Sequence, residues 1–178
     1  IINNNKINFC IVSPGFSAYS KEIKLLKEHK IKLLSELELG AIFCKSKYIF
    51  AITGTNGKTT TVNALHHIFK TANKQSFLCG NVGTPITEIA PQTTKNSFVV
   101  CEVSSFQMEV CNKYFNPHIS AILNLQPDHI DRHKTLQNYY FCKNKIFLAN
   151  PKTICFANRD DKNIIKTLKN NKKINYFS

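Results

Sequence analysis

The residues with the clearest chemical meaning form the run Gly54-Thr-Asn-Gly-Lys-Thr-Thr60, which lies between an apolar stretch and a stretch with helical spacing. Glycines in such a turn let backbone amides face inward, and the N-terminus of the following helix adds its dipole. Lys58 can then reach the β- and γ-phosphates of a nucleotide, and the Thr59 hydroxyl can bind Mg²⁺. The run predicts a nucleoside-triphosphate site made by Gly54, Thr55, Asn56, Gly57, Lys58, Thr59 and Thr60.

This loop is a variant of the general phosphate-loop pattern. The pattern GxxxxGK[ST] has a glycine at the position of Ile52, so the match is to the shorter sequence GTNGKT. A glycine turn without a ligand is the alternative interpretation. The apolar run before the turn and the helical pattern after it favour the phosphate loop.

Three more polar clusters follow apolar runs of the chain. They are GNVGTP at 80–85, EVSS at 102–105 and the run from Asn124 to His129. Open α/β sheets bind ligands at the carboxyl ends of their strands, so we expect these clusters near the phosphate loop. Glu102 is suited to hold Mg²⁺ against the phosphates, because this ion prefers a few oxygen ligands plus water. Capping of a helix at 105–112 is the alternative role of Glu102.

Two pairs of histidines are candidates for a metal site. His129 and His133 are four residues apart and could form half of a zinc site on a helix, but the sequence offers no further ligands for it. His66 and His67 fall on the helix after the phosphate loop, where a partly exposed helix face is the simpler interpretation. We therefore expect no zinc site.

The apolar pattern alternates between strands and helices and predicts an α/β fold with a doubly wound, mostly parallel sheet. Runs such as FVVCEV and ISAILNL fit strands that helices cover on both faces. The expected strands are 7–12, 31–34, 48–53, 76–79, 97–103, 119–124, 153–157 and 174–177. The expected helices are 18–30, 58–72, 84–90, 105–112, 135–149 and 161–169. The charged stretch Lys45 to Lys47 is the expected seam between two domains.

Composition narrows the class of protein further. The 178 residues carry a formal net charge of +13, but the lysines are spread along the chain without an arginine-rich tract. We therefore expect phosphorylated small substrates rather than nucleic acid as partners. Seven cysteines without a CxxC pair fit a reducing cytoplasm. The apolar runs are far shorter than the roughly 20 residues of a transmembrane helix, so we expect no membrane span.

Four motifs, in this order and at these spacings, resemble the Mur ligase family. The loop GTNGKTT alone is also typical of folylpolyglutamate and cyanophycin synthetases. The runs GNVGTP at 80–85, EVSSFQME at 102–109 and NLQPDHIDRH at 124–133 are similar to the family member that adds D-glutamate. The member that adds diaminopimelate or lysine usually reads SSHAL where this chain reads SSFQM. The resemblance extends from the SPG sequence at 13–15 to about residue 160.

The positions that match the family's motifs imply which residues bind the nucleotide and the metal ions. It assigns residues 54–60 to ATP, with Thr59 and Glu102 at one Mg²⁺ and His129 at a second. The lysine that is carbamylated in this family falls fourteen residues beyond His129, at Lys143. A carbamate would turn this cation into an anion that can bind Mg²⁺. The expected catalytic residues are Lys58, Glu102, His129 and Lys143.

The resemblance also implies which residues contact the other substrates. It assigns Asn81, Ser104 and His129 to UDP-N-acetylmuramoyl-L-alanine, and Gly15 to the uridine diphosphate part of that molecule. The family reaction forms an amide through an acyl phosphate. The implied activity is therefore ATP-dependent addition of D-glutamate to UDP-N-acetylmuramoyl-L-alanine, for peptidoglycan synthesis, by a cytoplasmic monomer.

The family's three-domain plan implies how this chain is divided. Residues 1–46 would be the C-terminal end of a Rossmann-like, UDP-binding N-terminal domain, and residues 47–178 the first part of the ATP-binding central domain. The domain that receives the amino acid would be absent. We therefore expect these residues to be a fragment that is inactive alone.

Three alternatives to this function stay open. A sister Mur ligase would add a different amino acid with the same chemistry. A nucleotide-binding module that has lost ligation would keep the phosphate loop, but it would not need Asn81, Glu102, His129 and Lys143 together. A basic nucleic-acid-binding domain would show steeply salt-dependent binding.

Overall fold

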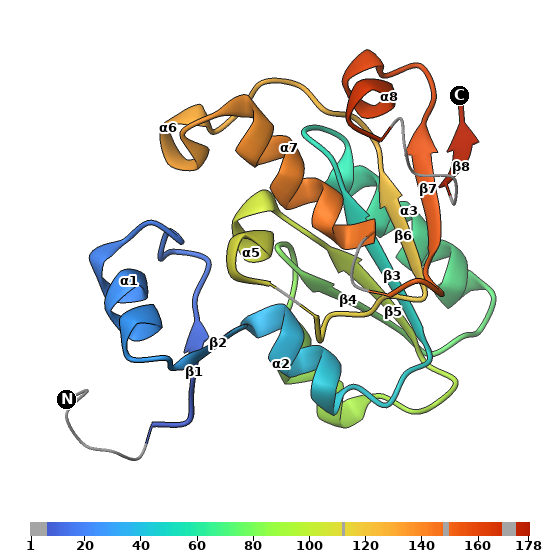
Figure 1. Cartoon of the computed structure of the whole chain (residues 1–178). Coiled ribbons are helices and arrows are strands. Elements are labelled where there is room, and N and C mark those ends of the chain that lie inside the picture. Colours follow the sequence, from blue (N-terminus) through green and yellow to red (C-terminus); the bar gives the residue numbers. More distant parts are fainter. Residues whose placement is uncertain (1–6, 112, 148–149, 169–173) are drawn as a thin grey trace.

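Two sheets of parallel strands organise the chain, which the computed structural model describes over residues 7–111, 113–147, 150–168 and 174–178 (Figure 1). The small N-terminal sheet pairs β1 (Phe9–Val12) with β2 (Lys32–Ser35), and α1 (Lys21–Glu28) connects them. The large sheet has six strands in the order β4-β5-β3-β6-β7-β8. Their bounds are Tyr48–Thr53 for β3, Ser76–Gly80 for β4, Phe98–Glu102 for β5, Ile119–Ile122 for β6, Ile154–Asn158 for β7 and Ile174–Phe177 for β8.

The strand order of the large sheet determines where a ligand can bind. β5 and β6 flank β3 on either side, and β4 pairs with the outer edge of β5. From β3 the chain continues towards β4, whereas from β6 it continues the opposite way towards β7 and β8, so the direction of the connections reverses between the neighbouring strands β3 and β6. Parallel sheets of this kind bind ligands at the reversal, beside the carboxyl ends of the strands. All pairs in this sheet are parallel, so the predicted doubly wound fold is confirmed.

Helices cover both faces of the large sheet (Figure 1). On one face, Val62 of α3 (Lys58–Thr71) lies in a cluster with Ile52 and Val100. The opposite face carries α2 (Glu36–Phe43), α5 (Ser105–Val110) and α7 (Leu136–Asn144), whose apolar side chains form the larger core with Ala51. Ala51 and Ile52 belong to different clusters because successive strand residues point to opposite faces. The other helices are α4 (Ile86–Ile89), η1 (Ala90–Gln92), α6 (Ile130–His133), η2 (Lys145–Phe147) and α8 (Lys162–Leu168).

The predicted element ranges match the structure closely, apart from two helices that the sequence analysis did not predict. One is α2, which begins with a capping box between Ser35 and Glu38. The other is α6, which is a single turn. The helix expected at 84–90 is shorter and passes into η1, because Pro91 has no N–H to continue the helical hydrogen bonds. Residues 112, 148, 149 and 169 of three expected helices lie outside the described residues.

The expected division into residues 1–46 and 47–178 stays a prediction. α2 packs against α4 on the large sheet, and Leu37 is fully buried in the larger core. The Oε1 atom of Glu36 accepts hydrogen bonds from the amide and the hydroxyl of Thr87, each at 2.8 Å. The segment before residue 47 therefore contacts the large sheet through α2. None of the helices in the described ranges is long and apolar enough to cross a membrane.

The C-terminal end of α5 depends on one lysine from another helix. The Nζ atom of Lys145 donates to the carbonyl oxygens of Met108, Glu109 and Cys111 at 2.8, 3.0 and 3.1 Å. These carbonyls belong to the last turn of α5, where the helix itself offers no donors. Lys145 thus anchors η2 to α5 and helps fix the position of the neighbouring α7.

Replacement of Lys145 by methionine is expected to lower the free energy of unfolding by about 1–3 kcal/mol, because it leaves partly buried carbonyl groups without their donor. Urea unfolding followed by circular dichroism measures this change. Lys152→Met, at an exposed turn, is the matched control and should change the stability by less than about 0.5 kcal/mol. Equal stability of the two variants would contradict the anchoring role of Lys145.

Candidate active site

The phosphate loop follows β3 as predicted, and it leaves the N-terminus of α3 open. Gly57 occupies the N-cap position with a φ of +78°, a left-handed conformation that favours glycine. No side chain caps this helix end, so the amides of the first turn are available to a phosphate. The Nζ atom of Lys58 turns back and donates to the carbonyl oxygen of Thr55 at 2.9 Å. The loop is thus a cradle of backbone amides beside one ammonium group.

The segment after β6 holds this cradle in shape. The side chain of Asn124 accepts from the Asn56 amide at 2.8 Å and donates to the Asn56 carbonyl at 3.0 Å. The carbonyl of Asn124 accepts from the Thr55 amide at 3.0 Å, and the Gln126 amide donates to Thr55 Oγ1 at 2.9 Å. The sequence analysis placed Asn124 near the site without predicting this clamp, because the clamp joins residues 68 positions apart.

Glu102 brings the predicted residues of three loops together at the end of β5. Its side chain is buried, with the residue only 2% exposed. One carboxylate oxygen accepts from the Thr59 hydroxyl at 2.7 Å, and the other accepts from the Asn81 side-chain amide at 2.8 Å. Asn81 follows Gly80, whose φ of +100° and close approach to the Glu102 carbonyl exclude a side chain at that position. The structure therefore places Thr59, Asn81 and Glu102 in one polar cluster.

Thr59 and Glu102 fit one side of a Mg²⁺ ion bound to a nucleotide. A hydroxyl and a carboxylate are both hard oxygen ligands, and at nucleotide sites Mg²⁺ uses one or two carboxylates, with phosphates and water at its other positions. Within the described residues, no group of three or more His, Cys, Asp or Glu side chains could form a metal site. The Thr59 hydroxyl and the Glu102 carboxylate therefore suit a Mg²⁺ ion whose other ligands are phosphates and water.

Lys143 lies on α7, and its side chain reaches the phosphate loop. Its Nζ atom donates to the carbonyl oxygen of Gly54 at 2.7 Å and lies 4.9 Å from the centre of the Tyr139 ring. Burial, and then the positive charge of Lys58, lower the pKa of Lys143 to about 7. Burial also raises the pKa of Tyr139 to about 12, and its hydroxyl lies 3.0 Å from Thr55 Oγ1. Lys143 is therefore a partly neutral amine beside the phosphate loop.

The two histidines of the DHIDRH sequence have different surroundings. His129 has a left-handed backbone with a φ of +50°, and its half-exposed ring lies 3.3 Å from Asp128 and 4.8 Å from the ring of Phe106. His133 is buried, and its Nε2 atom lies 3.0 Å from Ser105 Oγ. Burial lowers the pKa of His133 despite the opposite effect of a nearby carboxylate. The polar partners of the two rings differ, although both rings contact Phe106 and Tyr139.

These side chains line a pocket of about 250 Å³ at the carboxyl edge of the sheet. Its wall is formed by Thr55, Lys58, Asn81, Ser104, Ser105, Phe106, Asp128, His129, Tyr139 and Lys143. Five predicted site residues outside the phosphate loop are therefore close together, namely Asn81, Ser104, His129 and Lys143 in the wall and Glu102 bonded to Asn81. Thr60 is exposed on α3, and Gly15 lies outside this pocket in the N-terminal segment. The sequence analysis placed Ser105 and Asp128 in polar clusters near the loop without giving them a site role, and it missed Phe106 and Tyr139, whose contribution depends on packing between distant segments.

A doubly wound parallel sheet with a phosphate loop between its central strand and the next helix defines the P-loop class of nucleotide-binding proteins. Residues 52–178 match the family described as the Mur ligase middle domain. The chain therefore belongs to the Mur ligase family.

Two curated relatives of this chain carry the same name. It is 43% identical over 141 residues to the UDP-N-acetylmuramoylalanine–D-glutamate ligase of Thermoanaerobacter sp., an alignment that covers 79% of this chain and 31% of that protein. It is 41% identical over 179 residues to the ligase of the same name from Elusimicrobium minutum, which covers 94% of this chain and 39% of that protein. The chain thus spans between 31% and 39% of the length of these relatives.

Solved structures of Mur ligases share the fold at low sequence identity. The MurF ligase from Thermotoga maritima in complex with ADP superposes with a TM-score of 0.60 at 16% identity, over 99% of this chain and 48% of that one. The UDP-N-acetylmuramate:L-alanyl-γ-D-glutamyl-meso-diaminopimelate ligase from Neisseria meningitides has a TM-score of 0.60 at 15% identity, over 96% of this chain and 58% of that one. These similarities support the α/β fold of the family.

Proposed function

We propose that this chain is part of a cytoplasmic, ATP-dependent ligase that joins D-glutamate to UDP-N-acetylmuramoyl-L-alanine in peptidoglycan synthesis. The observation that carries the proposal is the cluster of Thr59, Asn81 and Glu102 beside an open phosphate loop. A protein that only bound a nucleotide would need the loop but not Asn81 on the carboxylate. The names of the curated relatives support D-glutamate as the amino acid.

The proposed chemistry is transfer of the ATP γ-phosphoryl group to the substrate carboxylate, followed by attack of the D-glutamate amine on the acyl phosphate. The amide forms as phosphate leaves, so no covalent link to the enzyme is needed. The loop amides and Lys58 would hold the phosphates in line with the carboxylate. Thr59 and Glu102 would hold Mg²⁺, which supplies neutralisation of the charge on the phosphates.

The UDP-linked substrate would then bind beside the phosphate loop. The wall made by Asn81, Ser104 and His129 is the proposed position of the muramoyl part of the substrate. Residues 1–46 would belong to the domain that binds the uridine diphosphate part, with Gly15 as a contact, and residues 47–178 to the ATP-binding domain. The Asp128–His129 pair is the proposed site near a second Mg²⁺.

We also propose that Lys143 is carbamylated. Carbamylation requires a neutral amine, which attacks CO₂ and releases a proton. At pH 7 about half of the Lys143 side chains are neutral given its pKa of about 7, whereas fewer than about one in 1,000 unperturbed lysines would be. The carbamate would place an anion near Lys58 and the phosphate loop, where the protonated form of Lys143 would be a second cation.

Carbamylation of Lys143 is expected to increase as the pH rises through 7, because deprotonation of the ammonium group supplies the reactive amine. ¹³C NMR of the full-length protein under a fixed pressure of ¹³CO₂ measures this as a carbamate signal. The signal should be absent from Lys143→Met and should persist in Lys152→Met, which replaces an exposed lysine. A signal that survives in Lys143→Met would contradict the assignment.

The proposed activity is tested on the full-length protein with ATP, Mg²⁺ and UDP-N-acetylmuramoyl-L-alanine. Phosphate release is compared with D-glutamate, meso-diaminopimelate and L-lysine as the added amino acid. Release that requires D-glutamate supports the proposal. Release with another amino acid would keep the reaction and change the specificity, whereas no release with any of them, despite ATP binding, would favour a nucleotide-binding module.

A further inference from the structure

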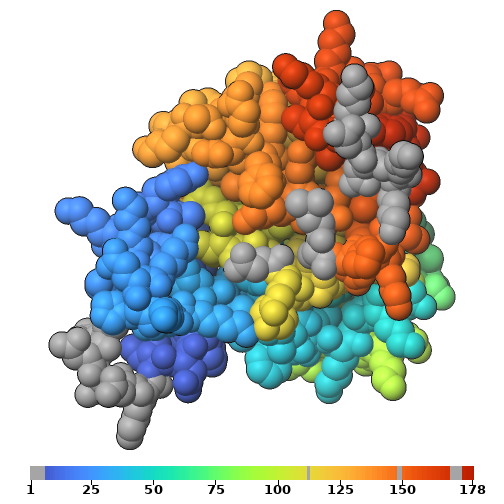
Figure 2. Space-filling model, viewed as in Figure 1, coloured from blue at the N-terminus to red at the C-terminus, as the bar shows by residue number. Residues whose placement is uncertain are grey.

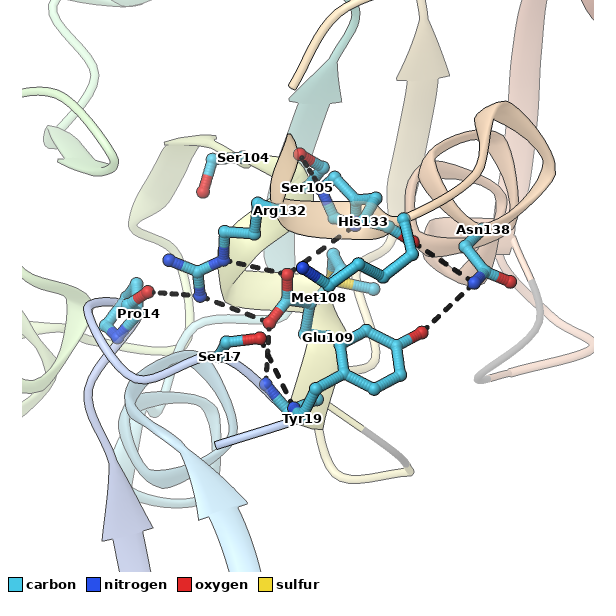
Figure 3. A network of polar contacts seen from close by, with 12 residues as sticks. Pro14, Ser17, Tyr19, Ser104, Ser105, Met108, Glu109, Arg132, His133 and Asn138 are labelled. Carbon is cyan, nitrogen blue, oxygen red and sulfur yellow. Dashed lines mark hydrogen bonds and ion pairs between the residues drawn. The ribbon is translucent and has the colours of Figure 1, made fainter. Parts of the chain in front are cut away.

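A buried ion pair outside the pocket links the N-terminal segment to α5 and α6 (Figure 3). Glu109 projects from α5 with its side chain only 2% exposed, and Arg132 of α6 approaches it with a side chain 16% exposed. The Nε atom of Arg132 donates to Oε1 of Glu109 at 2.9 Å, and its Nη2 atom donates to Oε2 at 3.1 Å. This two-point geometry is specific to arginine, because lysine cannot form two parallel hydrogen bonds with a carboxylate.

The same pair holds the loop at 13–19, which includes the SPG sequence. Nη2 of Arg132 also donates to the carbonyl oxygens of Pro14 and Phe16 at 2.6 and 3.1 Å. Oε2 of Glu109 accepts from the Ala18 amide at 2.9 Å. Backbone groups at three points of this loop are therefore fixed by one side chain of α5 and one of α6 (Figure 3).

A second contact binds the end of the same loop. The side-chain amide of Asn138, on α7, donates to the Tyr19 hydroxyl at 3.1 Å and to the carbonyl oxygen of His133 at 3.1 Å. Between these attachments, Gly15 is exposed and Phe16 is 51% exposed. Arg132 thus holds the backbone on both sides of Gly15, while Gly15 and the side chain of Phe16 stay exposed and able to contact a ligand.

Arg132 also forms part of the support behind the pocket wall. Its guanidinium group lies 4.1 Å from the centre of the Phe106 ring, and the ring of His129 lies 4.8 Å from that of Phe106. Phe106 and His129 both line the pocket. One side chain therefore contacts the loop at 13–19 and the wall at which the muramoyl part of the substrate is proposed to bind.

We propose that Arg132 and Glu109 are positioning residues that hold the loop at 13–19 at a fixed distance from the pocket, so that both ends of one long UDP-linked substrate are bound together. This inference rests on the proposed function. A buried ion pair contributes little net stability, since desolvation offsets its attraction. Here it fixes the position of the loop at 13–19 relative to α5 and α6. A substrate that spans two segments depends on that geometry, whereas ATP, bound by the phosphate loop, does not.

The test separates the two ligands in the full-length protein. Calorimetry measures the Kd of UDP-N-acetylmuramoyl-L-alanine and of a non-hydrolysable ATP analogue for Arg132→Ala, Arg132→Lys and Arg159→Ala. Arg159 is exposed and is the other arginine of the sequence, so it controls for loss of positive charge. Arg132→Ala should weaken binding of the UDP-linked substrate by at least about tenfold, and Arg132→Lys should restore only part of it. The ATP analogue should change less than about twofold in all variants.

Hydrogen exchange supplies a readout that does not depend on the substrate. The amides at 13–19 should exchange faster in Arg132→Ala and not in Arg159→Ala. Faster exchange with unchanged substrate affinity would overturn the positioning role, and unchanged exchange would overturn the attachment itself. If the wild-type protein did not bind the UDP-linked substrate at all, the proposed function would fail, while the exchange rates would still decide the attachment. If Arg132→Ala fails to fold, the same affinities and exchange rates are measured for Arg132→Lys.

Discussion

Replacement of Lys58 by methionine is expected to lower the rate of ATP-dependent phosphate release by at least about 100-fold. Lys58 is the cation at the mouth of the phosphate loop, and its Nζ atom is held at Thr55 by a single hydrogen bond to a carbonyl. That bond can be exchanged for contacts with the β- and γ-phosphates when ATP binds. Methionine preserves the length of the side chain and removes the charge that would stabilise the transferring phosphoryl group. Phosphate release by the full-length protein, with saturating substrates, measures the loss.

The control for this prediction is a lysine of the same helix region without a place in the site. Lys74 is exposed in the turn after α3, and Lys74→Met should keep the wild-type rate within about twofold. Both variants should retain the wild-type melting temperature, because neither side chain belongs to a core cluster. A rate for Lys58→Met within about threefold of wild type would exclude Lys58 from phosphoryl transfer.

Glu102→Gln is expected to reduce phosphate release by about 100-fold and to raise the Mg²⁺ concentration needed for half-maximal rate. Glutamine has nearly the same shape, and its oxygen can still accept one of the two hydrogen bonds from Thr59 and Asn81. Its NH₂ group cannot accept the other one, and it carries no negative charge for the metal. The variant therefore tests the negative charge of Glu102 while it nearly preserves the shape of the side chain.

A Mg²⁺ titration of the rate measures this effect directly. Glu88→Gln, at an exposed position of α4, is the control and should leave the titration unchanged. If Glu102 only capped the start of α5, Glu102→Gln would change the stability and leave the Mg²⁺ dependence as in the wild type. The structure already assigns that capping to Ser104, whose hydroxyl accepts from the Gln107 amide at 3.2 Å.

The parts of the site that the sequence predicted are those whose chemistry is local. The phosphate loop needs only the spacing of two glycines and Lys58 between a strand and a helix. Glu102 and Asn81 follow apolar strands, and parallel strands bring their carboxyl ends to one edge. Strand positions were predictable for the same reason, since two-faced burial leaves continuous apolar runs such as that of β5.

The remaining parts depend on contacts between distant segments. Lys143 was predicted only from the family resemblance, because Lys143 and Lys145 are two residues apart and equally basic in sequence. In the structure one reaches the Gly54 carbonyl and the other the end of α5, and burial lowers the pKa of Lys143. The attachment of Arg132 to Pro14 joins residues 118 positions apart. The spacing of apolar residues along the chain predicts neither such pairs nor the order of the strands in the sheet.

The crossing of the chain from β5 over β3 to β6 has a consequence for folding kinetics. The clamp of Asn124 on the phosphate loop closes a loop of 68 residues, and the contact of Lys143 with Gly54 spans 89. Closing such long loops lowers the conformational entropy of the chain before stabilising contacts have formed. These pairings therefore form late and slowly. The phosphate cradle acquires its final shape only when β6 has docked beside β3. The rate at which ATP-binding capacity appears during refolding therefore reports the docking of β6 beside β3, whereas local helix formation precedes it.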